Sequence, residues 1–289
     1  MQAAFEQPRT VDDAVALLAA HGQDARALAG GTDLLVQMRG GARTPALLVD
    51  LKRIGELTAV TIGPDEIAIG AACSTASLRE NEALVALLPG LLEAAELIGS
   101  EQIQGRSSLG GNLCNASPAA DSVPALVADR AVCEIAGPGG RRRLPVAQFP
   151  TGPGETALAP GEILVSLHLP HPGPRAADAY LRFIPRSEMD IAVVGASAFV
   201  RLDPDGGCEA ARLALGAVGP TVIDAADAAA TLVGGPIDAA ALERVAAAAR
   251  AAARPIDDKR GTAAYRRHVA GVLARRTVEI AARRAAERS

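Results

Sequence analysis

The chain has 289 residues, a formal net charge of −4, four Phe, two Tyr and no Trp. This length allows a sizeable core and favours two compact units over one. The mild acidity and the shortage of aromatic rings argue against a nucleic-acid-binding protein, which needs positive charge for phosphates and rings for stacking on unpaired bases.

The first 56 residues have the pattern of a small αβ unit. Apolar residues at helical spacing predict a helix over 11–20, and Thr10 is placed to act as its N-cap. Short apolar runs predict strands over 27–29 and 47–51. The first of these strands leads directly into the pair Gly30-Gly31.

Residues 57–173 alternate between hairpin patterns and helical patterns, and we interpret them as a second subdomain. The expected elements are a hairpin over 61–71, helices over 77–88 and 91–98, a hairpin over 131–144 and a strand over 162–169.

The segment Pro170–Pro174 contains three prolines in five residues and marks the clearest boundary, because proline continues neither a helix nor a central strand. We therefore predict one domain over 1–173 and another over 174–289. The second has three strand-like runs and then Ala-rich helical segments, which predicts an α+β unit with a three-stranded antiparallel sheet. The expected strands are 179–184, 191–202 and 208–218, and the expected helices are 224–233, 238–254 and 263–284.

Two glycine pairs stand out, in Ala29–Asp33 and in Ser107–Asn112. Without Cβ atoms, such loops let backbone N–H groups converge on an anion, and the hydroxyls of Thr32 and Ser108 add donors. Two loops of this kind suit the two phosphates of a dinucleotide. The alternative is that both are ordinary tight turns.

Polar side chains are dense after the second glycine pair, with Asn112, Asn115, Ser117 and Asp121 in one short stretch. Such groups suit a ligand rich in hydroxyls, such as a ribityl chain or a ribose. Asp121 or Ser122 could instead cap the helix that follows.

The sequence lacks the patterns of several common sites. It contains no G-x-G-x-x-G Rossmann fingerprint, no G-K-[ST] of a P-loop, no G-x-S-x-G nucleophile elbow and no H-E-x-x-H pattern. His168 and His171 flank the proline-rich boundary and are predicted to be exposed surface residues. Four scattered cysteines without a CxxC pair argue against a metal or iron–sulfur site in this chain and favour a reducing compartment. The charged N-terminus and the lack of a long apolar run predict a cytoplasmic protein with no signal peptide and no membrane insertion.

Taken together in order and spacing, these motifs resemble the FAD-binding medium subunit of the molybdenum hydroxylases, the xanthine dehydrogenase and carbon monoxide dehydrogenase family. The resemblance rests on Ala29–Asp33, on Gln104–Leu113 and on Ala116–Asp121. Three later segments, Arg182–Val194, Gly216–Thr221 and Asp257–Arg267, extend it over essentially the whole chain.

The resemblance implies a bipartite FAD-binding domain of the vanillyl-alcohol-oxidase (PCMH) type, with subdomains 1–56 and 57–173, followed by the small α+β domain. It implies that the two glycine loops hold the pyrophosphate, that Leu164 packs on the isoalloxazine and that Tyr180 and Arg182 lie near the flavin. Arg182 stands where the family usually has Lys. The implied FAD-binding residues are Leu28, Ala29, Gly30, Gly31, Thr32, Asp33, Ile98, Ile103, Ser108, Gly110, Gly111, Asn112, Asn115, Ala116, Asp121, Leu164, Tyr180 and Arg182.

The same resemblance implies an electron-transfer function. A large partner subunit would carry the molybdenum cofactor, a small one would carry two [2Fe–2S] clusters, and the complex would be a dimer of heterotrimers. This chain would pass electrons to NAD+, oxygen, a quinone or a dye, and no catalytic residue is expected in it. Two alternatives stay open: a stand-alone flavin oxidoreductase, and a scaffold subunit of the same fold without FAD.

Overall fold

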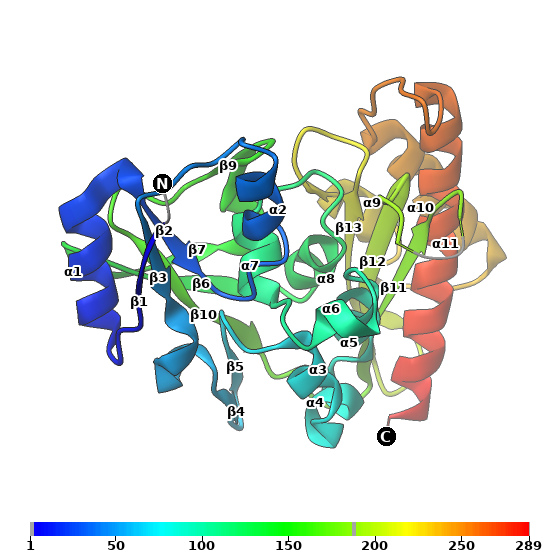
Figure 1. Cartoon of the computed structure of the whole chain (residues 1–289). Helices are drawn as coiled ribbons and strands as arrows, with labels where there is room; N and C mark the ends of the chain where they lie inside the picture. Colours follow the sequence, from blue (N-terminus) through cyan, green and yellow to red (C-terminus); the bar gives the residue numbers. More distant parts are fainter. Residues whose placement is uncertain (1–2, 187–188, 289) are drawn as a thin grey trace.

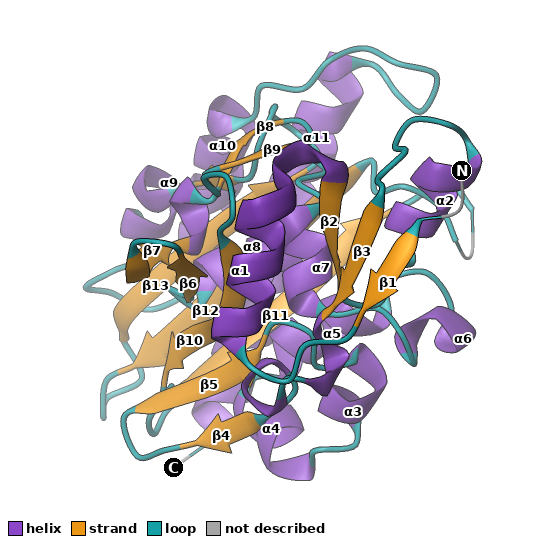
Figure 2. Cartoon of the chain, turned by 60° about the vertical axis from the view of Figure 1, so that its left-hand side comes forward, coloured by secondary structure: helices purple, strands orange, loops and turns teal. Residues whose placement is uncertain are grey.

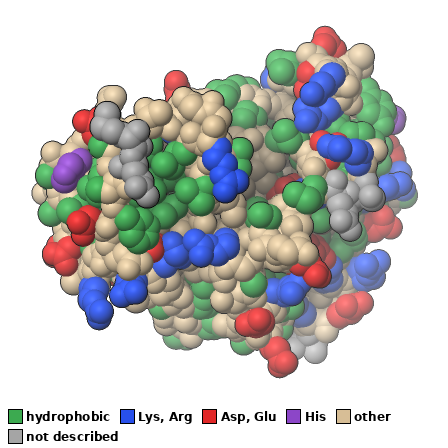
Figure 3. Space-filling model, viewed as in Figure 1, with side chains coloured by type: hydrophobic (Ala, Val, Ile, Leu, Met, Phe, Trp, Pro, Cys, Tyr) green, Lys and Arg blue, Asp and Glu red, His purple; other side chains and the backbone are tan. Residues whose placement is uncertain are grey.

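The computed structural model describes residues 3–186 and 189–288, which form three successive units from left to right in Figure 1. Each unit is built on its own sheet, of three, five and four strands. Figure 3 shows basic and acidic side chains interspersed over one face of all three units. No helix in the described residues is long and apolar enough to cross a bilayer.

The N-terminal unit is a parallel sheet in the order β1-β3-β2, with α1 lying alongside it (Figure 2). The Thr10 hydroxyl accepts from the Asp13 N–H at 3.1 Å, which confirms the predicted cap. The unit contains β1 (Ala4–Glu6), α1 (Val11–His21), η1 (Gly22–Asp24), β2 (Ala25–Leu28), α2 (Leu34–Arg39), β3 (Leu47–Asp50), η2 (Leu51–Arg53) and η3 (Gly55–Leu57).

The middle unit is an antiparallel sheet in the order β4-β5-β10-β6-β7, with six helices packed around it. Its strands are β4 (Val60–Ile62), β5 (Glu66–Gly70), β6 (Val132–Gly137), β7 (Gly140–Pro145), β10 (Ile163–Pro170) and the separate ribbon β8 (Pro150–Gly152) and β9 (Glu155–Thr156). Its helices are α3 (Thr75–Arg79), α4 (Glu82–Leu87), α5 (Pro89–Glu96), α6 (Glu101–Gln104), α7 (Leu109–Cys114), α8 (Ser122–Ala128) and the turn η4 (Val146–Gln148).

The helix predicted over 77–88 is two helices. α3 ends at Arg79, and Asn81 begins α4 by accepting the Leu84 N–H on its side-chain oxygen at 3.1 Å. Asparagine favours such N-cap positions because its side chain satisfies a free backbone donor. The apolar periodicity continues across the break, which is why the pattern predicted a single helix.

The C-terminal unit has four antiparallel strands, so the prediction of three is wrong by one short strand. The fourth strand, β14, has only two residues and pairs with the end of β13, and so short a run carries no alternation to detect. Against this sheet packs α11, a helix of 25 residues. The elements are β11 (Ala176–Phe183), β12 (Val194–Leu202), β13 (Cys208–Gly216), β14 (Ile223–Asp224), α9 (Ala226–Ala230), α10 (Ala239–Ala252) and α11 (Ala263–Glu287).

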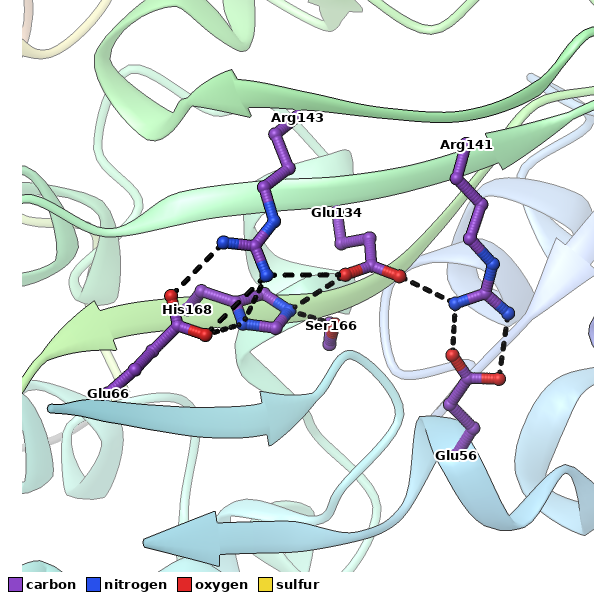
Figure 4. Close-up of polar contacts among 7 residues, drawn as sticks. All are labelled: Glu56, Glu66, Glu134, Arg141, Arg143, Ser166 and His168. Atoms are coloured by element: carbon purple, nitrogen blue, oxygen red, sulfur yellow. Dashed lines mark hydrogen bonds and ion pairs between the residues drawn. The ribbon is translucent and has the colours of Figure 1, made fainter. Parts of the chain in front are cut away.

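His168 is buried, with 9% of its surface exposed, so the prediction of an exposed histidine is wrong. It lies on β10, the central strand of its sheet, where side chains from the neighbouring strands β5 and β6 contact it. Figure 4 shows its imidazole between two carboxylates: Nδ1 is 2.7 Å from Glu66 and Nε2 is 3.1 Å from Glu134. Arg141 extends this network by pairing with both Glu134 and Glu56.

Two buried aspartates lie where the middle unit meets the C-terminal sheet. Asp178 on β11 accepts the Leu91 N–H at 2.8 Å through Oδ2, and its carboxyl group lies beside that of Asp129 at the end of α8. Within the described residues, Asp178 Oδ1 and both side-chain oxygens of Asp129 have no hydrogen-bond donor. This joint therefore contains two adjacent acids, and among the described residues only Oδ2 of Asp178 receives a hydrogen bond.

Candidate functional site

A cavity of about 880 Å³ lies between the N-terminal unit and the middle unit. Both glycine loops line it, although they are separated by more than 70 residues in the sequence. The predicted FAD-binding residues that line it are Leu28, Ala29, Gly30, Gly31, Thr32, Asp33, Ile98, Ser108, Gly110, Gly111, Asn112, Asn115 and Leu164.

The first glycine loop presents a row of free backbone donors. In the described part of the chain, the N–H groups of residues 30–34 have no backbone or side-chain acceptor. Gly31 has φ +78°, a left-handed conformation that glycine adopts without strain. Consecutive free N–H groups of this kind are the donors from which proteins build anion-binding concavities.

Gly30 has a packing role that the sequence did not reveal. A Cβ atom on Gly30 would lie 1.8 Å from the Arg106 carbonyl oxygen, so the first loop presses directly on the segment before the second. Only glycine allows this approach, which brings the two loops together beside the cavity.

In the second glycine loop, one glycine is also needed for close packing, and the other is not. A Cβ atom on Gly110 would lie 2.4 Å from the Ala71 carbonyl oxygen, whereas one on Gly111 would meet only the Ser108 hydroxyl, at 3.0 Å. Gly110 therefore serves packing. The Ser108 hydroxyl accepts the Gly111 N–H at 3.0 Å and caps α7, so this oxygen already has a backbone partner.

Amide side chains connect the walls of the cavity. Gln37 on α2 donates to the Asn115 side-chain oxygen after α7, at 3.1 Å. The Ser122 hydroxyl donates to the Asn112 side-chain oxygen at 2.7 Å and fixes its orientation. Gln37 lines the cavity and was missed from the sequence, because a polar residue on a short, exposed helix gives no signal of its own.

The rest of the lining includes an aliphatic surface, formed by Leu28, Leu51, Ile98, Leu158, Ile163 and Leu164. A cavity with free backbone donors in one part and aliphatic side chains in another fits a ligand that joins phosphates to a flat apolar ring. The residues present therefore suit FAD.

Five predicted site residues do not line this cavity: Ile103, Ala116, Asp121, Tyr180 and Arg182. The last three form a buried cluster that joins α8 to β11. The Tyr180 hydroxyl donates to Asp121 Oδ1 and Arg182 donates to Asp121 Oδ2, each at 2.8 Å. Asp121 makes no side-chain cap for α8, so the capping interpretation is wrong for its carboxylate.

Burial determines the protonation of this cluster. It raises the pKa of the Tyr180 hydroxyl well above its ordinary value, and the neighbouring Asp121 raises it further. Burial also raises the pKa of Asp121, while Arg182 and Tyr180 oppose that change. Tyr180 thus remains a donor.

Replacing Tyr180 by Phe removes one of the donors to the buried Asp121 carboxylate. We expect the free energy of unfolding to fall by about 1–3 kcal/mol, the cost of an unsatisfied buried acceptor. Urea unfolding of the full chain measures this. Tyr265, the only other tyrosine, is 45% exposed, so Tyr265→Phe is the matched control and should change stability by less than Tyr180→Phe.

Ser166, His168 and Glu66 are arranged in the order of a hydrolytic triad, with Ser166 Oγ 2.8 Å from His168 Nε2. Glu134 also contacts Nε2 of His168. A catalytic base needs this nitrogen free to take the serine proton, and the Glu134 carboxylate occupies that position. None of these residues lines the cavity. These side chains therefore have a structural role, in which they link the strands β5, β6 and β10. In the described residues, no cluster of three His, Cys, Asp or Glu side chains could hold a metal ion.

Two family models match the chain. The one described as the FAD binding domain in molybdopterin dehydrogenase matches residues 1–172, and the one described as the CO dehydrogenase flavoprotein C-terminal domain matches residues 179–281.

Related proteins agree with these matches. The putative xanthine dehydrogenase FAD-binding subunit of Escherichia coli (strain K12) is 38% identical over 224 residues, which cover 76% of each chain. The carbon monoxide dehydrogenase medium chain of Afipia carboxidovorans is 36% identical over 281 residues, which cover 97% of each chain.

Solved structures agree as well. Carbon monoxide dehydrogenase from Oligotropha carboxidovorans superposes with a TM-score of 0.94 at 35% identity, over 98% of this chain and 99% of that chain. Quinoline 2-oxidoreductase from Pseudomonas putida 86 superposes with a TM-score of 0.90 at 27% identity, over 99% and 98% of the two chains.

Proposed function

The chain belongs to the FAD-binding medium subunits of the molybdenum hydroxylase family, and from that premise we propose that it holds FAD in the cavity between its two glycine loops. The observation that carries this proposal is the row of free N–H groups at residues 30–34, which faces no acceptor within the described chain. The pyrophosphate would lie against this row and against Gly111. Leu164 and its aliphatic neighbours would support the ring.

When bound, the isoalloxazine supplies the redox chemistry, and the chain supplies binding and orientation. Asn112 and Asn115, which are held by Ser122 and Gln37, would meet the sugar-like parts of the cofactor. Tyr180 and Arg182 would act on the flavin by positioning the C-terminal sheet, since both bond to Asp121 and neither lines the cavity.

We propose that the chain accepts electrons from [2Fe–2S] clusters of a small partner subunit and delivers them to an external acceptor such as NAD+, oxygen or a quinone. A large partner would carry the molybdenum cofactor, and the complex would be a dimer of heterotrimers. Similarity to a carbon monoxide dehydrogenase medium chain over 97% of the sequence supports this assignment. Four free cysteines support a cytoplasmic location.

The finer description of the fold is also a proposal. Residues 1–173 would form the PCMH-type FAD-binding domain, divided into 1–56 and 57–173, and residues 174–289 the C-terminal domain. The separate sheets of the three units support these divisions.

The test is purification of the native complex followed by flavin, molybdenum and iron analysis. We expect the chain to co-elute with a large and a small subunit and to carry one FAD. A chain that shows no bound visible flavin absorbance after FAD is supplied would contradict the proposal. FAD-free chain inside an otherwise intact complex would indicate the scaffold alternative, and an active lone chain would indicate the stand-alone oxidoreductase.

A further inference from the structure

Lys52 lies behind the first glycine loop and contacts it directly. Its ammonium group donates to the Ala29 carbonyl oxygen at 2.8 Å and also pairs with the Asp50 carboxylate. Lys52 does not line the cavity, so any effect on a ligand passes through the loop. It is one of only two lysines in the chain, with Lys259.

The parallel sheet explains why these groups meet. β2 and β3 are paired with Leu28 opposite Asp50, so both strands end at the same edge. The glycine loop leaves β2 at this edge, and Asp50 and Lys52 leave β3 beside it. Ligands of parallel sheets bind at the carboxyl ends of the strands, which places Lys52 among the supports of the site.

Asp50 holds the ammonium group in place. Asp50 is 4% exposed, and its carboxylate accepts from the Gln7 side chain at 2.9 Å and from the Lys52 N–H at 3.2 Å. Burial by itself raises the pKa of Asp50, but the hydrogen bonds from Lys52 and Gln7 outweigh it and leave the pKa below its ordinary value. The Asp50 carboxyl group is thus ionised, and its hydrogen bonds with Gln7 and Lys52 fix its position.

The contact with Ala29 fixes the peptide plane that begins the anion-binding row. The chain has no cis peptide in its described residues, and in a trans peptide the C=O and the next N–H point in opposite directions. With the Ala29 carbonyl held by Lys52, the Gly30 N–H points away from Lys52.

We propose that the Lys52–Asp50 ion pair is a positioning device for the first glycine loop, which orients the Ala29–Gly30 peptide so that the loop binds the pyrophosphate of FAD. This inference rests on the proposed function and adds to it residues that the sequence did not single out. The ion pair acts on the phosphate end of the ligand and not on the ring.

The test uses the full chain and measures FAD binding by flavin fluorescence. Lys52→Met should raise the Kd for FAD by about tenfold to a hundredfold, the range for a lost charge-assisted hydrogen bond. Lys52→Arg keeps a cationic donor and should recover part of the loss. Lys259→Met is the matched control, because Lys259 is exposed, and it should bind FAD like the unaltered protein.

Competition by ADP and by riboflavin distinguishes a loss of loop positioning from a general loss of structure. In Lys52→Met, the inhibition constant of ADP against FAD should rise with the Kd of FAD, while that of riboflavin, which lacks phosphate, should stay unchanged. Because Lys52→Met leaves Asp50 buried without its cation, the double variant Asp50→Asn/Lys52→Met provides a folded comparison and should show the same selectivity between ADP and riboflavin.

Equal FAD affinity in Lys52→Met and Lys259→Met would overturn the inference and leave the proposed function standing. So would equal weakening of ADP and riboflavin in the folded double variant. Failure of the unaltered chain and of Lys259→Met to bind FAD would instead overturn the proposed function, and the inference with it.

Discussion

Gly30→Ala is expected to abolish the retention of FAD through purification and to lower the free energy of unfolding by about 3 kcal/mol or more. The new methyl carbon would lie 1.8 Å from the Arg106 carbonyl oxygen and 2.6 Å from its carbonyl carbon. Both partners are backbone atoms, so no side-chain rotation relieves the overlap. The two loops must move apart, and the cavity between them loses its shape.

Two further glycine variants make this result specific. The Cβ atom of Gly111→Val would meet only the Ser108 hydroxyl, and Gly111 lines the cavity, so we expect a folded chain whose binding surface is obstructed and whose FAD content is lost. Gly55→Ala has no atom within 4 Å of its new carbon and should match the unaltered protein in both respects. Thermal unfolding and flavin-to-protein absorbance report the two properties separately. A Gly30→Ala protein with full FAD content would refute the contact between the loops.

Asp129→Asn is expected to make the protein more stable than the unaltered chain at neutral pH and to flatten the dependence of stability on pH. Burial, and then the neighbouring Asp178, raise the pKa of Asp129 well above its ordinary value. One proton shared by the two carboxyl groups would satisfy two of the three oxygens that find no donor among the described residues. An asparagine amide supplies that hydrogen at every pH.

The sign of the pH effect follows from the raised pKa. A group that binds its proton more tightly when folded contributes its full stability below its unfolded pKa of about 3.9, and it loses that contribution as the pH rises toward the folded pKa. Over this interval Asp129 should lower the free energy of unfolding by about 1.4 kcal/mol for each unit of pH increase. Urea unfolding at a series of pH values should show this slope in the unaltered chain and a smaller slope in Asp129→Asn.

Asp178→Ala should behave in the opposite way, because it leaves the buried Leu91 N–H without its acceptor and should cost about 1–3 kcal/mol. Asp205→Asn, at an exposed turn, is the neutral control. Parallel stability curves for Asp129→Asn and the unaltered chain would exclude a shared proton.

The sequence predicted the importance of the two glycine pairs, but it did not show which glycine of each pair is needed for packing. A short strand followed by two glycines indicates a tight loop near a ligand, and both loops do line one cavity. That Gly30 and Gly110 serve packing depends on Arg106 and Ala71, which are distant in the chain and carry no local signal. Local pattern thus predicted which segments meet and could not say which atoms touch.

The same limit explains the polar residues. Asp121 precedes a helix, and the local rule assigns it to a cap; only the tertiary arrangement brings Tyr180 and Arg182 to its carboxylate. Asp129 and Asp178 look like an ordinary helix end and an ordinary strand residue, and their pairing arises when α8 meets β11. Most of the helices and strands were predictable from periodicity, because each is governed by residues near it in sequence.

The cavity lies on a seam between two units, so FAD bound there would hold the two units together as well as supply redox chemistry. Across the seam, the contacts include Gly30 against Arg106 and the hydrogen bond from Gln37 to Asn115. A ligand that binds only the closed seam stabilises it by mass action, by about 2.7 kcal/mol at a free concentration one hundred times its Kd. In a cell poor in flavin, newly made chains without FAD would separate at the boundary between the two units more often than chains with FAD. Proteases would therefore cleave the FAD-free chains first. The supply of FAD would then set how much of the subunit survives to be assembled.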